Sequence, residues 1–153
     1  MQERIAIFPG TFDPFTKGHE DIVLRGLNLF DKVISALGVN AQKKRLFSTD
    51  EMMDYINETF AAYDKVEVKT YKGLTADFAE VEGAQFILRG LRNTTDFEYE
   101  NAISQGNKHL NENLETVFLI TSPQYAYISS TTARDIYRHG GDVDAFLPYK
   151  IKS

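Results

Sequence analysis

Residues 4–30 read RIAIFPGTFDPFTKGHEDIVLRGLNLF. The stretch opens with a short apolar run at 4–8, which is typical of a strand covered on both faces of a parallel sheet. A turn rich in glycine and proline follows. After it, Thr16 has a side chain suited to cap a helix that runs to about residue 30. The apolar face of that helix consists of Ile22, Val23, Leu27 and Phe30. This order of strand, loop and helix is the repeating unit of α/β proteins.

The same alternation continues through the rest of the chain. We expect five strands, at residues 4–8, 32–39, 66–70, 85–88 and 116–120. We expect helices at about residues 16–30, 48–63, 74–81 and 95–110, and a last one that begins at Ser129 or Ser130 and ends at Gly140. Capping-box spacing marks two of the helix starts, at Ser48 with Glu51 and at Thr95 with Glu98. The pattern predicts an α/β fold with a doubly wound, five-stranded parallel sheet and right-handed crossovers.

Length and composition fit one domain over residues 1–153. The chain has 17 Lys and Arg against 22 Asp and Glu, and the net charge of −5 argues against a general nucleic-acid binder. The absence of cysteine excludes disulfides, thiolate metal sites and cysteine nucleophiles. No apolar run reaches the roughly 18 residues of a membrane helix, and no signal peptide is evident. We therefore expect a cytoplasmic protein with neither a membrane nor a nucleic-acid partner.

Ligands of doubly wound sheets bind beyond the carboxyl ends of the strands, so the loops at those ends are the place to look for chemistry. The first such loop is PGTFDPFTKGH, residues 9–19. Gly10 and Gly18 would allow a ligand to approach the backbone. The helix N-terminus that follows suits a phosphate, and Lys17 and His19 would strengthen the binding. A plain turn with a solvated histidine is the alternative. Neither a Walker A nor a GxGxxG pattern is present.

Two more loops and one basic run belong to the same sheet edge. In residues 89–100, two arginines around a glycine could hold phosphate oxygens, or could pair with the acidic residues that follow. In residues 125–134, four consecutive hydroxyls exceed what capping requires, and the two tyrosines either line a base or belong to the core. The basic run 43–45 is either solvated or attracts an anionic second substrate. The convergence of the loops favours phosphate binding.

Signatures of a known superfamily lie in these loops. GTFDPFTKGH resembles the T/HxGH motif of nucleotidyltransferases, and ISSTTAR resembles their ISSTxxR motif. RGLRNTTDFEYE is similar to a block of the bacterial phosphopantetheine adenylyltransferases, and the resemblance runs from about residue 4 to 149. It implies a Rossmann-like nucleotidyltransferase fold and reversible transfer of the adenylyl group of ATP to 4′-phosphopantetheine, giving dephospho-coenzyme A and pyrophosphate. It also implies Mg²⁺ as cofactor and a homohexamer. The closing helix common in relatives is missing, which bears on assembly more than on chemistry.

The resemblance implies a role for individual residues. His19 would stabilise charge on the α-phosphate in the transition state, with Lys43 and Arg92 as further catalytic residues. The residues implied in ATP binding are Thr11, Phe12, His19, Gly90, Leu91, Arg92, Glu100, Tyr125, Ala126, Tyr127, Ile128, Ser129, Ser130 and Thr131. Those implied in phosphopantetheine binding are Thr11, Lys43, Thr75 and Arg89. The role of Glu100 rests on the resemblance alone, because its spacing favours a surface acid. No dedicated metal ligands are expected, since Mg²⁺ binds mostly through substrate phosphates and water.

Two alternatives stay open. A nucleotidyltransferase for another phosphorylated small-molecule acceptor would carry both superfamily motifs, although the block at 89–100 argues against it. A non-catalytic nucleotide-binding module on the same fold would have no need of Lys43 on the acceptor side. A structural or interaction protein would leave the glycine- and hydroxyl-rich loops without a role.

Overall fold

Strand β1 (Ile5–Gly10) lies at the centre of the sheet in the computed structural model, which describes residues 2–152. The strand order is β3-β2-β1-β4-β5, and every neighbouring pair is parallel. The other strands are β2 (Lys32–Gly38), β3 (Val66–Tyr71), β4 (Phe86–Leu91) and β5 (Glu115–Ile120). The chain winds outward from β1 to β3 and then returns to place β4 on the other side of β1. The predicted doubly wound, five-stranded α/β fold is confirmed.

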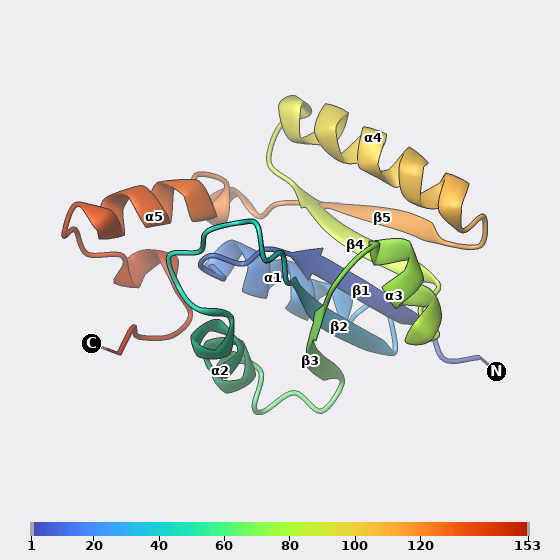
Figure 1. Ribbon diagram of the computed structural model, residues 1–153, viewed down its shortest axis with the longest axis horizontal. Helices are drawn as coiled ribbons and strands as arrows, with labels where there is room; N and C mark the ends of the chain where they lie inside the picture. The colour runs from blue at the N-terminus through green and yellow to red at the C-terminus, as the bar shows by residue number, and fades with distance from the viewer. Residues whose placement is uncertain (1, 153) are drawn as a thin grey trace.

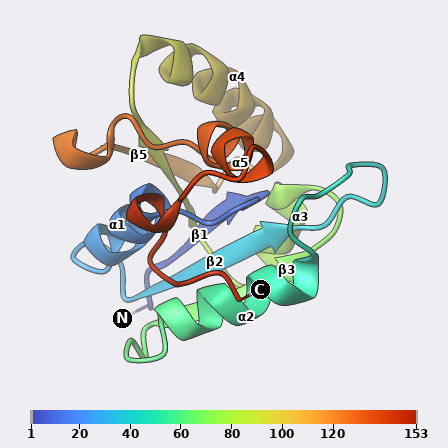
Figure 2. The same ribbon diagram turned by 90° about the vertical axis from the view of Figure 1, so that its left-hand side faces the viewer.

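Helices cover both faces of this sheet (Figures 1 and 2). They are α1 (Lys17–Gly26), α2 (Thr49–Thr59), α3 (Thr75–Val81), α4 (Thr94–Leu110) and α5 (Ser130–Arg138), with short 3₁₀ turns η1 (Pro123–Tyr125) and η2 (Asp144–Phe146). Phe8 of β1 packs with α1 and α2 on one face, whereas its neighbour Ile7 packs with α3 on the other. Within residues 2–152, none of the helices has the length and apolar character needed to cross a membrane.

Three of the predicted helix starts are confirmed by their capping hydrogen bonds. Thr16, Ser48 and Ser129 each accept a hydrogen bond from the backbone N–H three residues further on. Helix α4 differs, because Asn93 accepts the N–H of Asp96 and the predicted start at Thr95 is wrong. Asparagine is among the best N-cap residues, and here it comes directly after the strand, so the helix begins earlier.

Several element boundaries also differ from those predicted. Helices α1 and α2 end at Gly26 and Thr59, about one turn before the predicted ends at 30 and 63. Strand β4 continues through Leu91 because it stays paired with β5 as far as Ile120. Arg89, predicted in a loop, therefore lies within a strand. Its position fixes its side chain more firmly than a loop would.

Strands β1 and β4 separate towards their carboxyl ends. They pair only through Ala6 and Ile7 of β1, whereas the β1–β2 and β4–β5 pairs run to the ends of these strands. The gap falls at the point where the strand order reverses, which is where such sheets bind ligands. Across it, the guanidinium group of Arg89 donates a hydrogen bond to the carbonyl of Pro9. A side chain thus replaces a backbone bond of the sheet, and the sheet opens without leaving that carbonyl unpaired.

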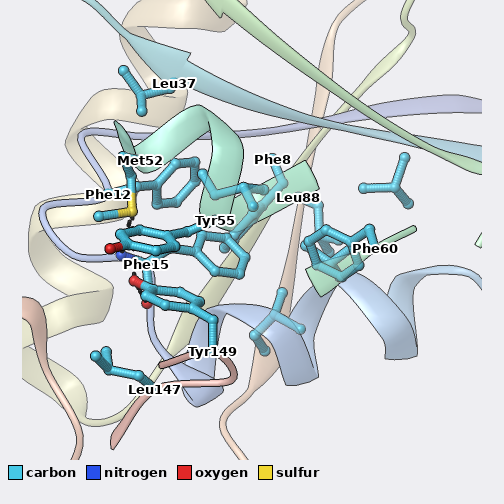
Figure 3. Packing of buried hydrophobic residues seen from close by; sticks show 14 of the residues in the cluster. Phe8, Phe12, Phe15, Leu37, Met52, Tyr55, Phe60, Leu88, Leu147 and Tyr149 are labelled. Carbon is cyan, nitrogen blue, oxygen red and sulfur yellow. Dashed lines mark hydrogen bonds between the residues drawn. The ribbon is translucent and has the colours of Figure 1, made fainter. Parts of the chain in front are cut away.

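The C-terminal segment packs beneath the first loop through Tyr149 (Figure 3). The Tyr149 ring stacks on Tyr55, with 4.5 Å between ring centroids. Its hydroxyl donates to the carbonyl of Phe15 at 2.7 Å. Burial raises the pKa of Tyr149, which keeps the phenol protonated as a donor. The sequence gives this tail no role, but the structure uses it to close the core under the loop.

Replacement of Tyr149 by phenylalanine tests this closure. Tyr149→Phe keeps the stacked ring but leaves the buried carbonyl of Phe15 without its donor. We expect the free energy of unfolding, measured in urea, to fall by about 1–3 kcal/mol. Tyr63→Phe, at an exposed ring in the turn after α2, is the control and should change it by less than about 0.5 kcal/mol. Equal stabilities of the two variants would contradict the role assigned to the hydroxyl.

Candidate active site

A cavity of about 490 Å³ lies where β1 and β4 separate. It is lined by the first loop, the end of β4, the turn before α2 and the start of α5, so the predicted loops meet here. The predicted residues that line it are Thr11, Phe12, His19, Lys43, Arg89, Gly90, Arg92, Glu100, Tyr125, Ile128, Ser129, Ser130 and Thr131. Most of the predicted site residues, which come from distant parts of the sequence, therefore line one cavity.

A second cavity, of about 310 Å³, adjoins the first and shares Thr11 and Arg89 with it. Thr75, at the start of α3, lines this second cavity and not the first. Its hydroxyl lies 2.9 Å from the hydroxyl of Tyr71. Three of the four residues predicted to bind phosphopantetheine thus surround a separate space next to the main cavity.

The remaining predicted residues lie outside both cavities. Leu91 is half-buried at the end of β4, and Ala126 is exposed after η1. Tyr127 is exposed as well, with its ring 5.7 Å from that of Phe146. Tyr125 is half-buried and lines the main cavity. Neither tyrosine belongs to the core, and only Tyr125 faces the space in which a ligand would lie.

His19 lies in the first turn of α1, with its ring against three phenylalanines. The ring centroids of Phe8, Phe12 and Phe15 are 5.9, 5.1 and 5.2 Å from that of the imidazole. The backbone N–H of Thr16 donates to Nδ1 at 2.9 Å. Because Nδ1 accepts, the neutral ring carries its proton on Nε2. His19 is therefore held in one tautomer, and Nε2–H is the donor left for a ligand.

The electrostatic surroundings keep His19 uncharged. Burial lowers the pKa of His19 to about 3, and the guanidinium groups of Arg89 and Arg92 add to the shift. At neutral pH the imidazole is thus a hydrogen-bond donor without a positive charge. The ring is half-buried and packed among aromatic side chains, which argues against the alternative of a freely solvated histidine in a plain turn.

The first loop is held by its carbonyl groups. Six of its backbone carbonyls accept hydrogen bonds from side chains of the rest of the chain. The pairs are Pro9 with Arg89, Thr11 and Phe12 with Arg45, Asp13 with Arg134, Pro14 with Ser130, and Phe15 with Tyr149. The donors, which include the guanidinium groups of Arg45, Arg89 and Arg134, offset the partial negative charge of these oxygens, which would otherwise repel an anion in the cavity. The arrangement favours a negatively charged ligand.

Phe12 contributes backbone rather than side chain to the cavity. Its ring is buried, 5.4 Å from Phe8 and 5.0 Å from Phe15 between centroids, and its φ of +49° is unusual for a residue other than glycine. A Cβ on Gly10 would lie 2.5 Å from the Phe12 ring. Glycine is thus required at position 10 to accommodate that ring, and Gly10 also lines both cavities, where the sequence predicted close approach of a ligand.

The arginines of the β4–α4 segment are paired with carboxylates. Arg89 donates to both oxygens of Glu100, at 2.8 and 2.7 Å, and Arg92 donates to both oxygens of Asp96, at 3.0 and 3.2 Å. The pairing alternative is therefore confirmed, although both arginines also line the cavity. Glu100 is buried, so its interpretation as a surface acid is wrong. It neutralises the strand arginine that bridges the opened sheet.

The hydroxyls at the start of α5 all have partners within the protein. Ser129 caps the helix and donates to Thr132, Ser130 donates to the Pro14 carbonyl, and Thr131 accepts from Arg134. These hydroxyls stabilise the loop through contacts within the protein. The backbone N–H groups at the N-terminus of α5 are then the groups best placed to donate hydrogen bonds to a phosphate. This explains why four hydroxyls stand where capping needs one.

Two residues that organise the cavity were not predicted to do so from the sequence. Asp13 is buried, and its carboxylate accepts the N–H groups of Leu46 and Phe47 at 2.9 Å each. Arg45, third in the basic run, turns inward onto the loop carbonyls. The acid between Phe12 and proline was the available signal, but charge type alone does not show that a side chain points inward.

The chain matches the cytidylyltransferase-like family over residues 7–136. Its fold is similar to that of a solved bifunctional NMN adenylyltransferase/ADP ribose pyrophosphatase from Francisella tularensis, with a TM-score of 0.74 at 15% identity. The match covers 97% of this chain and 46% of that one. A second structure of that protein, described as complexed with AMP and a Mn ion, gives a TM-score of 0.69 over 98% of this chain and 46% of that one, also at 15% identity. Fold and family together define a nucleotidyltransferase.

Curated relatives identify the family more closely. A phosphopantetheine adenylyltransferase from Cytophaga hutchinsonii is 66% identical over 148 residues, covering 97% of this chain and 99% of the relative. One from Flavobacterium johnsoniae is 52% identical over 149 residues, covering 97% of each. The chain belongs to the phosphopantetheine adenylyltransferase family.

The low pKa of His19 predicts how stability depends on pH. Below about pH 6.5 the unfolded chain protonates this histidine and the folded chain does not, so acidification favours unfolding. We expect His19 to reduce the free energy of unfolding by at most about 1.4 kcal/mol per pH unit between pH 6.5 and 3. The measurement is urea unfolding of the wild-type chain and of His19→Gln across this range. Parallel curves for the two proteins would contradict the lowered pKa.

Proposed function

We propose that this chain catalyses the reversible transfer of the adenylyl group of ATP to 4′-phosphopantetheine, with release of pyrophosphate. The observation that carries the proposal is 66% identity to a phosphopantetheine adenylyltransferase over nearly the whole of both chains. In this reaction a phosphate oxygen of the acceptor attacks the α-phosphorus of ATP and forms a new phosphoanhydride. The bond between the α- and β-phosphates breaks, and dephospho-coenzyme A and pyrophosphate result. This is the penultimate step of coenzyme A synthesis.

We assign the nucleotide to the cavity of about 490 Å³. The N-terminus of α5 and the first loop, whose carbonyls are turned to protein donors, support phosphate binding there. The proposed ATP contacts are Thr11, Phe12, His19, Gly90, Leu91, Arg92, Glu100 and the run Tyr125, Ala126, Tyr127, Ile128, Ser129, Ser130 and Thr131. Phe12 would act through its backbone because its ring is buried. Leu91, Ala126 and Tyr127 lie outside the cavity walls and would reach only the outer part of the nucleotide.

Positioning and charge stabilisation account for the chemistry. The acceptor phosphate is an anion already, so no protein base is needed. His19 would donate Nε2–H to an α-phosphate oxygen as negative charge grows in the transition state. Arg92 lines the cavity on the β4 side and would face the β- and γ-phosphates of ATP, which leave as pyrophosphate. Lys43, whose Nζ lies 3.4 Å from the Thr11 hydroxyl, would hold the attacking phosphate beside the loop.

The second cavity suits the acceptor. Thr11 and Arg89 border both cavities, so a molecule with its phosphate between them would extend its arm past Thr75. Arg89 is already paired with Glu100 and the Pro9 carbonyl, which supports a role in shaping this junction together with binding. We therefore propose Thr11, Lys43, Thr75 and Arg89 as the phosphopantetheine-binding residues.

Mg²⁺ is the metal we propose for the reaction. The Francisella tularensis neighbour is described with a Mn ion, which supports divalent metal use in this fold. The three carboxylates that line the main cavity, Asp13, Asp96 and Glu100, are all engaged by backbone N–H groups or arginines. Residues 2–152 contain no cluster of three metal-ligating side chains. Mg²⁺ would therefore be bound by substrate phosphates and water, where it would neutralise phosphate charge.

We also propose a cytoplasmic homohexamer. Helix α4 and the edge strand β5 leave several large apolar side chains exposed, which supports association with further subunits. The exposed residues are Phe97, Tyr99, Ile103, Leu110 and Ile120. Sedimentation velocity would test the number of subunits.

One assay tests the reaction. Pyrophosphate release from ATP is measured with 4′-phosphopantetheine, nicotinamide mononucleotide or glycerol 3-phosphate as acceptor, in the presence of Mg²⁺. We expect turnover with phosphopantetheine only. Turnover with another acceptor and none with phosphopantetheine would favour the alternative nucleotidyltransferase, and ATP binding without turnover would favour a binding module.

Replacement of His19 tests the transition-state role. His19→Ala should lower kcat by about two to three orders of magnitude, because one preorganised donor is lost. ATP affinity, measured by calorimetry, should change much less. His139→Ala, at an exposed histidine after α5, is the control and should leave kcat unchanged. Nearly normal turnover of His19→Ala would remove this residue from the mechanism.

Replacement of Lys43 tests the position of the acceptor. Lys43→Ala should raise KM for phosphopantetheine and lower kcat, because Nζ would contact the attacking phosphate. The KM for ATP should change little. The measurement is steady-state kinetics with each substrate varied in turn. A loss confined to ATP binding would contradict the assignment of Lys43 to the acceptor.

A further inference from the structure

Arg45 connects the first loop, which lines the proposed nucleotide cavity, to the turn before α2, which carries the proposed acceptor-binding residue Lys43. Its side chain is only 13% exposed and is directed onto the first loop. Nη1 donates to the Thr11 carbonyl at 2.6 Å and Nη2 to the Phe12 carbonyl at 2.9 Å. Nε donates to the Phe47 carbonyl of its own segment at 2.8 Å. One planar group thus joins the loop of the nucleotide cavity to the turn before α2.

Asp13 makes the reciprocal connection. Its two carboxylate oxygens accept the N–H groups of Leu46 and Phe47, and one of them lies 3.9 Å from Arg45 Nη2. The loop therefore binds the turn through its side chain, and the turn binds the loop through Arg45. Between these contacts lies Phe12 at φ +49°, a left-handed conformation that residues other than glycine rarely adopt. The two-way contact holds the backbone in this strained form.

Lys43 lies two residues before Arg45 on the same turn. Its Nζ reaches the Thr11 hydroxyl, while Arg45 takes the carbonyl of that same residue. The distance between the acceptor-binding lysine and the nucleotide-binding loop is thus set through Arg45. Near-attack geometry is sensitive to displacements of about 1 Å, so this distance bears directly on the rate.

We propose that Arg45 is a positioning residue. It fixes the turn that carries Lys43 relative to the Thr11–Phe12 backbone, so that the acceptor and the nucleotide are aligned for in-line attack. The proposal rests on the proposed adenylyl transfer. Arg45 acts through the two carbonyls, and no contact with substrate is assigned to it. Its planar, three-point contact is one that lysine cannot reproduce.

A double-mutant cycle tests the proposal. We expect Arg45→Lys to lower kcat about ten- to a hundredfold, with a smaller change in either KM. Lys43→Ala should then cost at least about fivefold less in the Arg45→Lys background than in the wild-type chain, because the lysine is no longer held in place. If Arg45 had only a structural role, the effects of Arg45→Lys and Lys43→Ala on kcat would be independent of each other. Additive losses, or a kcat of Arg45→Lys within twofold of the wild type, would overturn the proposal.

Controls separate this proposal from the proposed function and from folding. Arg4→Lys, at an arginine 61% exposed at the other end of the sheet, should leave kcat unchanged. Arg45→Gln, which keeps an N–H₂ donor, is a second variant should Arg45→Lys not fold. Amide hydrogen exchange at Leu46 and Phe47 needs no substrate, and should accelerate in Arg45→Lys but not in Arg4→Lys. Unchanged exchange overturns the two-way contact, whereas a wild-type chain without turnover overturns the proposed function alone.

Discussion

A buried carbonyl needs a hydrogen-bond donor, and the stretch from Pro9, near the end of β1, to Phe15 has six carbonyls that are paired with side chains. The strand that would have continued the sheet beside it diverges, so backbone donors are missing on that side. Side chains of β4, the turn before α2, α5 and the C-terminal segment supply them instead. The shape of the cavity, the strained Phe12 and the tautomer of His19 all depend on this loop being held.

The charge of the site follows from the same arrangement. The chain as a whole is acidic, with a net charge of −5, yet its main cavity is lined by a surplus of cations. The carboxylates among the lining residues are consumed by backbone N–H groups or by arginines, so they do not offset the lysines and the helix N-terminus for a ligand. A net charge that argues against a nucleic-acid partner is thus compatible with the proposed binding of small phosphorylated molecules, because the distribution of charge rather than its total governs the cavity.

Local signals were enough to predict the fold and which loops line the main cavity. Strand alternation and the caps at Thr16, Ser48 and Ser129 depend on a few neighbouring residues, and they were predicted correctly. The alternation of strands and helices placed His19 and Lys43 at one sheet edge, where the structure brings them together, and the resemblance supplied their expected roles. Arg45, Asp13 and Tyr149 act across 30 to more than 130 residues, and no spacing rule reveals such partners. Glu100 was wrongly predicted to be a surface acid. Its partner, Arg89, was expected in a loop but lies in strand β4, so the spacing along the chain did not reveal the pair.

The donors of the first loop are spread along almost the whole of the described residues, and this has a consequence for the order of folding. The donor for the Phe15 carbonyl is Tyr149, 134 residues further along the chain. Local contacts within β1 and α1 therefore cannot fix this loop by themselves. The walls of the main cavity become fixed only after segments that are distant in the sequence have packed against the loop.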